Sequence, residues 1–322
     1  MIYESDLDFH IPENIPHNWA ETGYFNIYIP EKNIFFWVYI VHRAGVGATV
    51  TNVEIIDHWS DCIDDSLYVD YTNHNPLPAN ARKFSLPSGV SFEARSLKEY
   101  TLNYAGRGVA FSLEMTSIME PYDIHDPSMD PMAIEDPEVA VTKTGFGTAY
   151  ASHFDMSLRI KGSLTLGDET YPVDCVSTMD HSWGPRPEDN FQPITWNNAH
   201  FGENYVVHAI FHYDRFAPPG KEHIFRHGYA LVDGKVRGAK AGSAKAIRKG
   251  DSDNVIAVEM KIIDVDDREH IIHGVAVNHT PWRFFGNAHS TMAMMEWRRP
   301  GSDDVAYGTY FDAWPTNQLR KK

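Results

Sequence analysis

The chain has 322 residues, 43% of them hydrophobic, which is enough to bury a large core in one large domain or two smaller ones. Its 28 basic and 44 acidic residues give a formal net charge of −16, which repels the phosphates of nucleic acids and anionic lipids. No run of about eighteen apolar residues is present, and the first residues are polar and acidic, so we expect a cytoplasmic protein with no integral membrane association.

The two cysteines, Cys62 and Cys175, lie far apart in the sequence. Two distant cysteines cannot form a disulfide framework or a thiolate metal site by spacing. We expect both to be reduced, buried small residues.

Alternation with a period of two dominates the chain. From Val109 to Met119 most odd positions are apolar and most even positions are polar, which is typical of a half-buried strand. Long amphipathic helices are missing. We predict an all-β protein with two tandem domains, 1–190 and 191–322, each an antiparallel barrel or sandwich. The same pattern, rich in aromatic and β-branched residues, predicts further strands over 24–29, 34–42, 48–55, 97–105, 153–166, 171–179, 204–214, 255–263, 270–278 and 289–297.

Trp37 and Tyr39 lie in the predicted strand 34–42, which is apolar on both faces. The two rings share one face because they are two residues apart. They are candidate substrate-binding residues, since an aromatic-lined barrel interior suits a flat or isoprenoid ligand. Large aromatic residues also commonly fill a protein core, so a purely structural role stays open.

The segment 121–137, PYDIHDPSMDPMAIEDP, is the clearest long loop in the sequence. Its prolines and acidic residues favour a solvated acidic loop. A functional lid is the alternative, because loops of more than about fifteen residues are usually either disordered or functional.

A Gly-Asp pair at 167–168 predicts the turn of a hairpin, since it lies between two alternating runs and suits a two-residue primed turn. With Leu166 opposite Glu169, the register places Asp155 opposite Asp180. Facing residues then match in charge, polarity or hydrophobicity, as in the pairs Lys161–Asp174, Ser157–Thr178, Met156–Met179 and Ile160–Cys175.

Facing residues on neighbouring strands have Cβ atoms about 4.5 to 5.5 Å apart, so the carboxylates of Asp155 and Asp180 would repel each other if both were ionised. We therefore predict that one of them holds a proton near neutral pH, as a general acid must. His181 and His153, the latter a candidate substrate-binding residue, flank the pair. The alternative is that both acids lie at wet strand ends and that a bulge breaks the register.

The stretch MDHSWGPRP at 179–187 gathers an acid, an imidazole, a hydroxyl, an indole and a guanidinium. A long strand, a hairpin and then this motif resemble the lipocalin-like proteins related to hydroxyneurosporene synthase, the carotenoid 1,2-hydratase family. The resemblance covers about 146–186. It departs at Met179, where the family has a basic residue, and this weakens the transfer of a particular substrate.

This resemblance implies two lipocalin-like barrels in tandem and a cofactor-independent hydratase, cyclase, isomerase or lyase that acts on a hydrophobic substrate. The family's acid and aromatic motif is carried over onto Asp180, His181, Trp183 and Arg186.

The residues WNNAH at 196–200 add Trp196 and His200 to the candidate substrate-binding residues. In the predicted strand 204–214, His208 and His212 share a face, and such a pair could ligate zinc or iron with a third ligand. No further ligand spacing supports a metal, so we predict no metal and no other cofactor. We expect these histidines to hydrogen-bond inside a polar barrel.

Other enzyme classes lack their motifs here. The glycines of 45–47 and 145–147 are too few for a nucleotide-binding loop, and no GxSxG elbow is present. Ser182 follows His181 directly, and neighbours on a strand point to opposite faces, so a serine nucleophile is excluded.

Two functions remain open. The first is an acid–base lyase or hydratase, or a cyclase or isomerase, acting on a hydrophobic terpenoid or aromatic molecule. Asp180 or Asp155 would donate a proton, the other carboxylate and His181 would manage its return, Arg186 would stabilise the shared charge, and Trp183 would line the apolar side. The second is a non-catalytic carrier of such a molecule, which needs an apolar cavity but no facing carboxylates. The partners we expect are thus a hydrophobic small molecule and a second copy of the chain in a homodimer.

Overall fold

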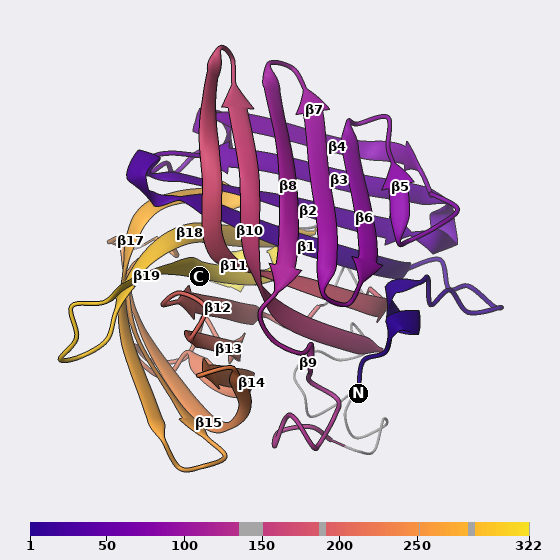
Figure 1. Cartoon of the computed structure of the whole chain (residues 1–322). Coiled ribbons are helices and arrows are strands. Elements are labelled where there is room, and N and C mark those ends of the chain that lie inside the picture. The colour runs from indigo at the N-terminus through magenta and orange to yellow at the C-terminus, as the bar shows by residue number, and fades with distance from the viewer. Residues whose placement is uncertain (135–150, 187–190, 251, 283–286, 322) are drawn as a thin grey trace. The chain divides into compact units, whose positions relative to one another are not determined.

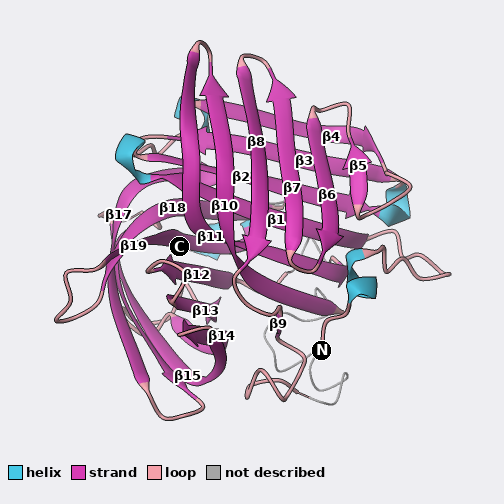
Figure 2. Cartoon of the chain, in the orientation of Figure 1, coloured by secondary structure: helices cyan, strands magenta, loops and turns pink. Residues whose placement is uncertain are grey.

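The computed structural model describes residues 1–134, 151–186, 191–250, 252–282 and 287–321 (Figure 1). Strands dominate this part of the chain, and no α-helix occurs in it (Figure 2). None of its helical segments is long and apolar enough to cross a membrane. They are short 3-10 turns, η1 (Glu4–Leu7), η2 (Pro30–Lys32), η3 (Ala44–Val46), η4 (Ile63–Asp65) and η6 (Thr316–Lys321).

Two compact units divide the chain. The first contains residues 1–56, 67–123 and the described part of 150–186, and the second contains 57–66, the described part of 124–149 and the described residues after 186. The described strands before residue 187 lie in the first unit and the later ones in the second. The segments 57–66 and 124–134 belong to the second unit, although they precede the predicted boundary near residue 190.

The described strands of the first unit form an 11-stranded antiparallel sheet in the order β4-β3-β2-β1-β11-β10-β8-β7-β6-β5, with β9 paired to β10 at the side. Their bounds are β1 (Trp19–Ile29), β2 (Ile34–Arg43), β3 (Ala48–Ile56), β4 (Tyr68–Pro76), β5 (Lys83–Ser85), β6 (Val90–Ser96), β7 (Glu99–Gly106), β8 (Val109–Ser117), β9 (Tyr122–Asp123), β10 (Ser152–Leu166) and β11 (Glu169–Pro185).

This sheet curls, so that β6 to β8 run across β1 to β4 within the unit (Figure 1). Aromatic side chains fill the space between the two layers. The ring of Phe36 on β2 lies 5.5 Å from that of Phe111 on β8, and Phe25 on β1 lies at the same distance from Phe92 on β6. Burial of these rings is a large apolar contribution to the stability of the unit.

The described strands of the second unit close into an antiparallel barrel. Alternate residues of β13, such as Val207, Ala209 and Phe211, belong to its apolar core cluster. The strands follow one another around the barrel, and their bounds are β12 (Ile194–His200), β13 (Tyr205–Tyr213), β14 (His223–Val232), β15 (Lys235–Arg248), β16 (Val255–Asp264), β17 (Glu269–Trp282), β18 (Ala288–Arg298) and β19 (Val305–Pro315).

The predicted all-β fold with two antiparallel barrel domains is confirmed, the first as a curled sheet and the second as a closed barrel. Each strand predicted from the alternation corresponds to a strand of the structure, and several extend further than predicted. The pattern missed β4, β5, β6, β9, β12, β14, β15 and β19.

The predicted hairpin register is confirmed. Leu166 pairs with Glu169, and the ladder continues without a bulge through Ile160–Cys175 to Asp155–Asp180. Gly167 at the turn has φ 59°, the left-handed value that a two-residue primed turn requires.

Two expectations about surface and burial are wrong. In the described part of the loop 121–137, Asp130 is fully buried and its Oδ2 lies 2.7 Å from Nδ1 of His227 on β14, so this segment packs on the barrel instead of lying in solvent. Residues 135–137 lie outside the described structure. Cys62 and Cys175 are both free, but Cys62 is exposed where we expected burial.

Replacing Asp130 by alanine will destabilise the second unit. The change leaves His227 buried without its carboxylate partner, and loss of one member of a buried pair costs about 3 to 5 kcal/mol. Urea denaturation measures the free energy of unfolding, and Asp303→Ala, an exposed aspartate of the same unit, is the control. Equal stabilities of the two variants would refute an anchoring role for Asp130.

Candidate active site

A row of four side chains crosses four neighbouring strands of the first unit. Asp155 on β10 faces Asp180 on β11, Asp180 faces Tyr24 on β1, and Tyr24 faces Tyr39 on β2. Residues that face each other across a ladder point to the same side of a sheet, so all four share one face. We call it the carboxylate face, and it also carries His153, Ser182 and Trp37, each two residues along its strand from a member of the row.

The carboxylate of Asp155 is fully buried and is paired with a histidine. Its Oδ2 lies 2.9 Å from Nε2 of His153, a side chain that is only 5% exposed. Burial alone would lower the pKa of His153, but the neighbouring carboxylate of Asp155 outweighs this effect, and the pKa is raised above 6.5. A charged His153 beside Asp155 is therefore favoured near neutral pH.

Asp180 has a pKa raised from 3.8 to about 7. Loss of solvent around the carboxyl is the largest cause, and the charge of Asp155 adds to it, while His153 and Arg186 act in the opposite direction. Near neutral pH, Asp180 is thus protonated in a large fraction of molecules. The side chain keeps partial exposure within the described part of the chain.

Arg186 is buried next to this pair. Its Nη2 donates a hydrogen bond of 2.8 Å to Oγ of Ser182, and that hydroxyl lies 2.7 Å from Oγ1 of Thr22. The guanidinium lowers the pKa of both Asp180 and His153, so its positive charge acts on both side chains. Ser182 is engaged in these bonds, in agreement with its exclusion as a nucleophile.

Tyr24 is a site residue that the sequence pattern missed. Burial raises the pKa of its phenol well above 10, and the charge of Asp180 contributes in the same direction, so the hydroxyl stays protonated. Its ring makes an edge contact with Tyr39, and Nε1 of the neighbouring Trp37 donates to Oδ1 of Asn52 at 3.0 Å. Tyr24 could not be found earlier because nothing local indicates that β1 pairs with β11.

His181 and Trp183 lie on the other face of β11, and our expectation that His181 shares a group with the carboxylates is therefore wrong. Adjacent positions on a strand alternate between faces, and His181 is next to Asp180 in the chain. The ring of Trp183 stacks on His10 with ring centroids 3.6 Å apart. A pocket on this side is lined by His181 and not by the carboxylates.

Three side chains with metal-binding atoms meet on that same side. Atoms of His10, Glu21 and His181 lie within 4.8 Å of one another. Glu21 accepts a hydrogen bond of 2.7 Å from the backbone N–H of His10, and its other oxygen lies 3.3 Å from the His10 ring. These contacts join Glu21 to His10, and we assign the group no metal.

Trp196 and His200 lie in the second unit, on the face of β12 that does not point into the barrel core. The ring of Trp196 makes an edge contact with His208, and burial lowers the pKa of His200 to about 3. His208 and His212 alternate with the core residues of β13, so they lie outside the barrel and not inside it as expected. Within the described residues they join no group of three metal-ligating side chains.

The family model described as Domain of unknown function (DUF7064) matches residues 4–312, and the chain belongs to this family. No curated protein matches the sequence.

Several solved structures are similar over nearly their whole length. A protein assigned as AttH from Nitrosomonas europaea is 13% identical, with a TM-score of 0.61 over 98% of this chain and 96% of its own. Kievitone hydratase from Nectria haematococca is 11% identical, with a TM-score of 0.55 over 98% and 93%. CghA, solved with Sch210972, is 13% identical, with a TM-score of 0.59 over 94% and 89%. The TM-scores show that these proteins share the fold of this chain, and at such low identities they show the fold alone.

Replacing Asp180 by asparagine will remove a pH dependence of stability. Because its pKa is higher in the folded chain than the ordinary 3.8, the wild type loses stability as the pH rises from about 4 to about 7 and loses no more above that. Each pKa unit corresponds to about 1.4 kcal/mol, and partial exposure reduces the effect. The free energy of unfolding of Asp180→Asn relative to that of the wild type should therefore be roughly 2 to 4 kcal/mol higher at about pH 7 than at about pH 4. Urea denaturation at both values measures it, and a constant difference would contradict the raised pKa.

Proposed function

We propose that this member of the DUF7064 family is an acid–base enzyme of hydratase or cyclase type that acts without a cofactor on a hydrophobic small molecule. One observation carries the proposal. Asp180 faces Asp155 across the β10–β11 ladder and has a pKa of about 7, so it can hold a proton at neutral pH and release it during a reaction. General acids work best when their pKa lies near the working pH.

In a hydration, the proton of Asp180 adds to one carbon of a substrate double bond and leaves a positive charge on the other carbon. A water molecule attacks that carbon and forms the new carbon–oxygen bond. The surplus proton of the added water returns to the carboxylate of Asp180, which restores the starting state. The reverse sequence removes water. Attack by a second double bond in place of water closes a ring and moves the positive charge to another carbon, and loss of a proton from a neighbouring carbon to the carboxylate of Asp180 gives the neutral product.

The pair of His153 and Asp155 completes this machinery. Their contact of 2.9 Å holds a negative charge on Asp155 close to the carbon that becomes positive. Such fixed charges stabilise a cationic intermediate at little cost in reorganisation. His153 thus takes the place of His181 as the histidine of the acidic group, and its part is to hold the charge of Asp155.

The hydrophobic, terpenoid or aromatic nature of the substrate is inferred from the same face. Tyr24, Tyr39 and Trp37 place buried aromatic rings on the same face as the carboxylates. The motif of 180–186 resembles the carotenoid 1,2-hydratase family, and the fold is shared with a hydratase and with CghA. A lyase class, a homodimer and a cytoplasmic location belong to this proposal on sequence grounds, and binding roles for Trp183, Trp196 and His200 remain predictions.

A non-catalytic carrier is the second candidate. A carrier gains nothing from two facing carboxyl groups, one of them buried and the other largely desolvated, since loss of solvent costs free energy and neither group is needed to hold an apolar ligand. The carboxylate pair therefore favours the enzyme.

Asp180→Asn and Asp155→Asn will each lower turnover by about a hundredfold to ten-thousandfold, the usual contribution of general acid–base catalysis. The amide keeps the shape of the side chain but cannot give up a proton in the same way. The wild type and variants are incubated with a panel of isoprenoid and lignin-type aromatic compounds, and products are followed by mass spectrometry. Asp168→Asn, an exposed residue in the turn of the same hairpin, is the matched control. Folded variants of both acids with near-normal turnover would leave the carrier as the better account.

Arg186→Gln will shift the pH profile of turnover. The guanidinium holds the pKa of Asp180 down, so its removal raises that pKa and extends activity to higher pH. The expected change is a displacement of the falling limb of the profile to alkaline pH. A profile that moves to acid pH, or one that only decreases in height, would show that Arg186 does not act on the charge of Asp180.

A further inference from the structure

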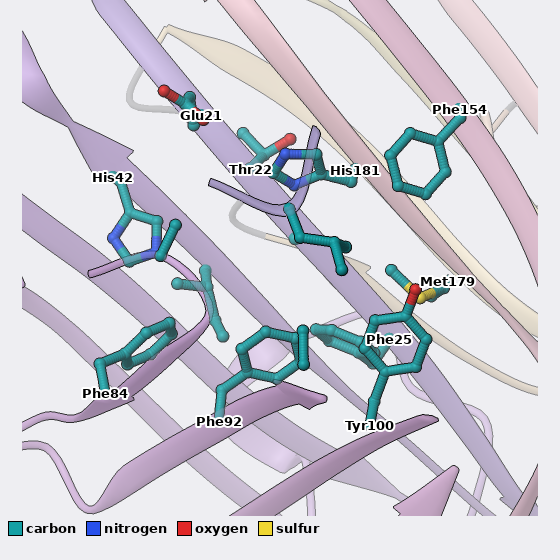
Figure 3. Close-up of a pocket in the computed structure, with 15 residues that line it drawn as sticks. Glu21, Thr22, Phe25, His42, Phe84, Phe92, Tyr100, Phe154, Met179 and His181 are labelled. Carbon is teal, nitrogen blue, oxygen red and sulfur yellow. The ribbon is translucent and has the colours of Figure 1, made fainter. Parts of the chain in front are cut away.

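A pocket lies between the two layers of the first unit, on the side of β1 and β11 opposite the carboxylate face. Figure 3 shows Phe84, Phe92 and Tyr100 on one side, and His181, Thr22 and Glu21 on the other. Most of its lining is aromatic or aliphatic, with polar groups gathered at one end. This arrangement is typical of a small-molecule site, where apolar walls supply affinity and a few polar atoms fix orientation.

A glycine opens the pocket beside the His181 ring. Gly23 faces His181 across the β1–β11 ladder and Ile40 across the β1–β2 ladder. A Cβ atom at Gly23 would meet the Phe25 ring at 3.4 Å and no backbone within 4 Å. The backbone therefore does not demand glycine here, and its effect is to leave free space against the His181 ring.

His181 presents an unused acceptor at the polar end. Its ring hydrogen-bonds the backbone of Thr22, while the buried Nε2 has no hydrogen-bond partner among the described residues. Burial lowers the pKa of the ring to about 3, so it is neutral, with one donor and one acceptor nitrogen. A buried acceptor without a partner carries a desolvation cost that a donor on a ligand would recover.

Glu21, at the same polar end of the pocket, is not available to bind a cation. The two oxygens of its buried carboxylate face the backbone N–H and the ring of His10. Hydrogen bonds to Glu21 and Asp6 outweigh burial and raise the pKa of His10. The charge of Glu21 is thus balanced by its own neighbour, and the chemistry left at this end is a neutral acceptor.

We propose that this pocket is a second binding site, separate from the carboxylate pair, for a small apolar molecule that carries one hydroxyl group. The hydroxyl donates to Nε2 of His181, and the apolar part lies against Phe25, Phe92 and Met179. The proposal does not depend on catalysis at Asp180.

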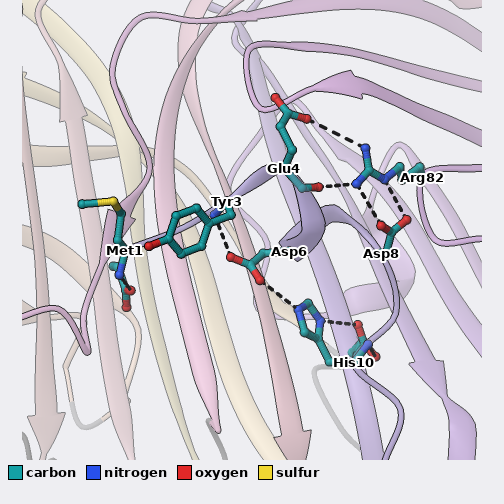
Figure 4. A network of polar contacts seen from close by, with 9 residues as sticks. Met1, Tyr3, Glu4, Asp6, Asp8, His10 and Arg82 are labelled. Atoms are coloured by element: carbon teal, nitrogen blue, oxygen red, sulfur yellow. Dashed lines mark hydrogen bonds and ion pairs between the residues drawn. The ribbon is translucent and has the colours of Figure 1, made fainter.

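The N-terminal segment closes the pocket. Leu7 of η1 lines it, and the free volume open to the centres of water molecules is about 40 Å³, room for about three waters. Arg82 holds this segment with two contacts to Asp8, of 2.7 and 2.8 Å, and His10 is held between Asp6 and Glu21 (Figure 4). Leu7 therefore limits the room for an aromatic ring, and a smaller residue at position 7 enlarges the pocket.

Phenol and toluene, which differ in the hydroxyl alone, test the site by isothermal titration calorimetry with the full chain. The wild type should bind phenol about five- to tenfold more tightly than toluene, the usual value of one hydrogen bond. His181→Phe should abolish this preference and keep toluene binding. Leu7→Ala should bind both compounds more tightly, and Gly23→Val, which fills the space, should lose both.

Circular dichroism confirms that the variants fold, and valine suits a strand better than glycine does. Asp180→Asn and Asp155→Asn should keep the preference for phenol, so failure of the catalytic proposal leaves this test intact. Equal phenol binding by the wild type and Gly23→Val would place the ligand elsewhere and overturn the proposal. A preference that survives in His181→Phe, or no phenol binding by the wild type and Leu7→Ala, would overturn it as well.

Discussion

The ladder between β10 and β11 is the constraint on which the rest of the candidate site depends. Its register is fixed at the turn by Gly167 and is kept without a bulge to the far end of the hairpin. Because side chains alternate between faces, this register decides the chemistry of each face. A slip of β11 by one residue would turn Asp180 toward the apolar pocket and His181 toward Asp155. Asp155 and Asp180 face each other only in the observed register, in which the other facing residues of the hairpin also match in charge or hydrophobicity.

Placing two carboxyl groups together away from water has an electrostatic cost, and the first unit reduces it in two ways. His153 and Arg186 bring positive charge to the group, and Asp180 keeps a proton that an exposed aspartate would release. The two cations do not cancel the effect of burial, as the raised pKa of Asp180 shows. Carboxyl groups with a strongly raised pKa are common at active sites, where a side chain that is protonated at neutral pH can act as an acid.

One strand thus serves two environments. Even positions of β11 carry the acid of Asp180 and the hydroxyl of Ser182, with the guanidinium of Arg186 just after the strand, while Met179 and His181 line an aromatic pocket. The fold is shared with proteins that are only 11% to 13% identical to this chain, and a fold alone does not set an activity. The activity therefore has to be argued from the side chains on these two faces of the sheet.

The sequence by itself determined the all-β class, most strands and the β10–β11 register, because alternation and a two-residue turn are local properties. It indicated the Asp155–Asp180 pair for the same reason. Other local turn signals in the sequence were not used to predict strands. One is Asp233-Gly234, a pair with positive φ values that forms the turn between β14 and β15. Only the tertiary structure decided that Tyr24 joins Asp180, that His181 belongs to a pocket with Phe92, and that Asp130 is buried on His227. These contacts join segments far apart in the chain, and their energy comes from shared burial, which no single segment encodes.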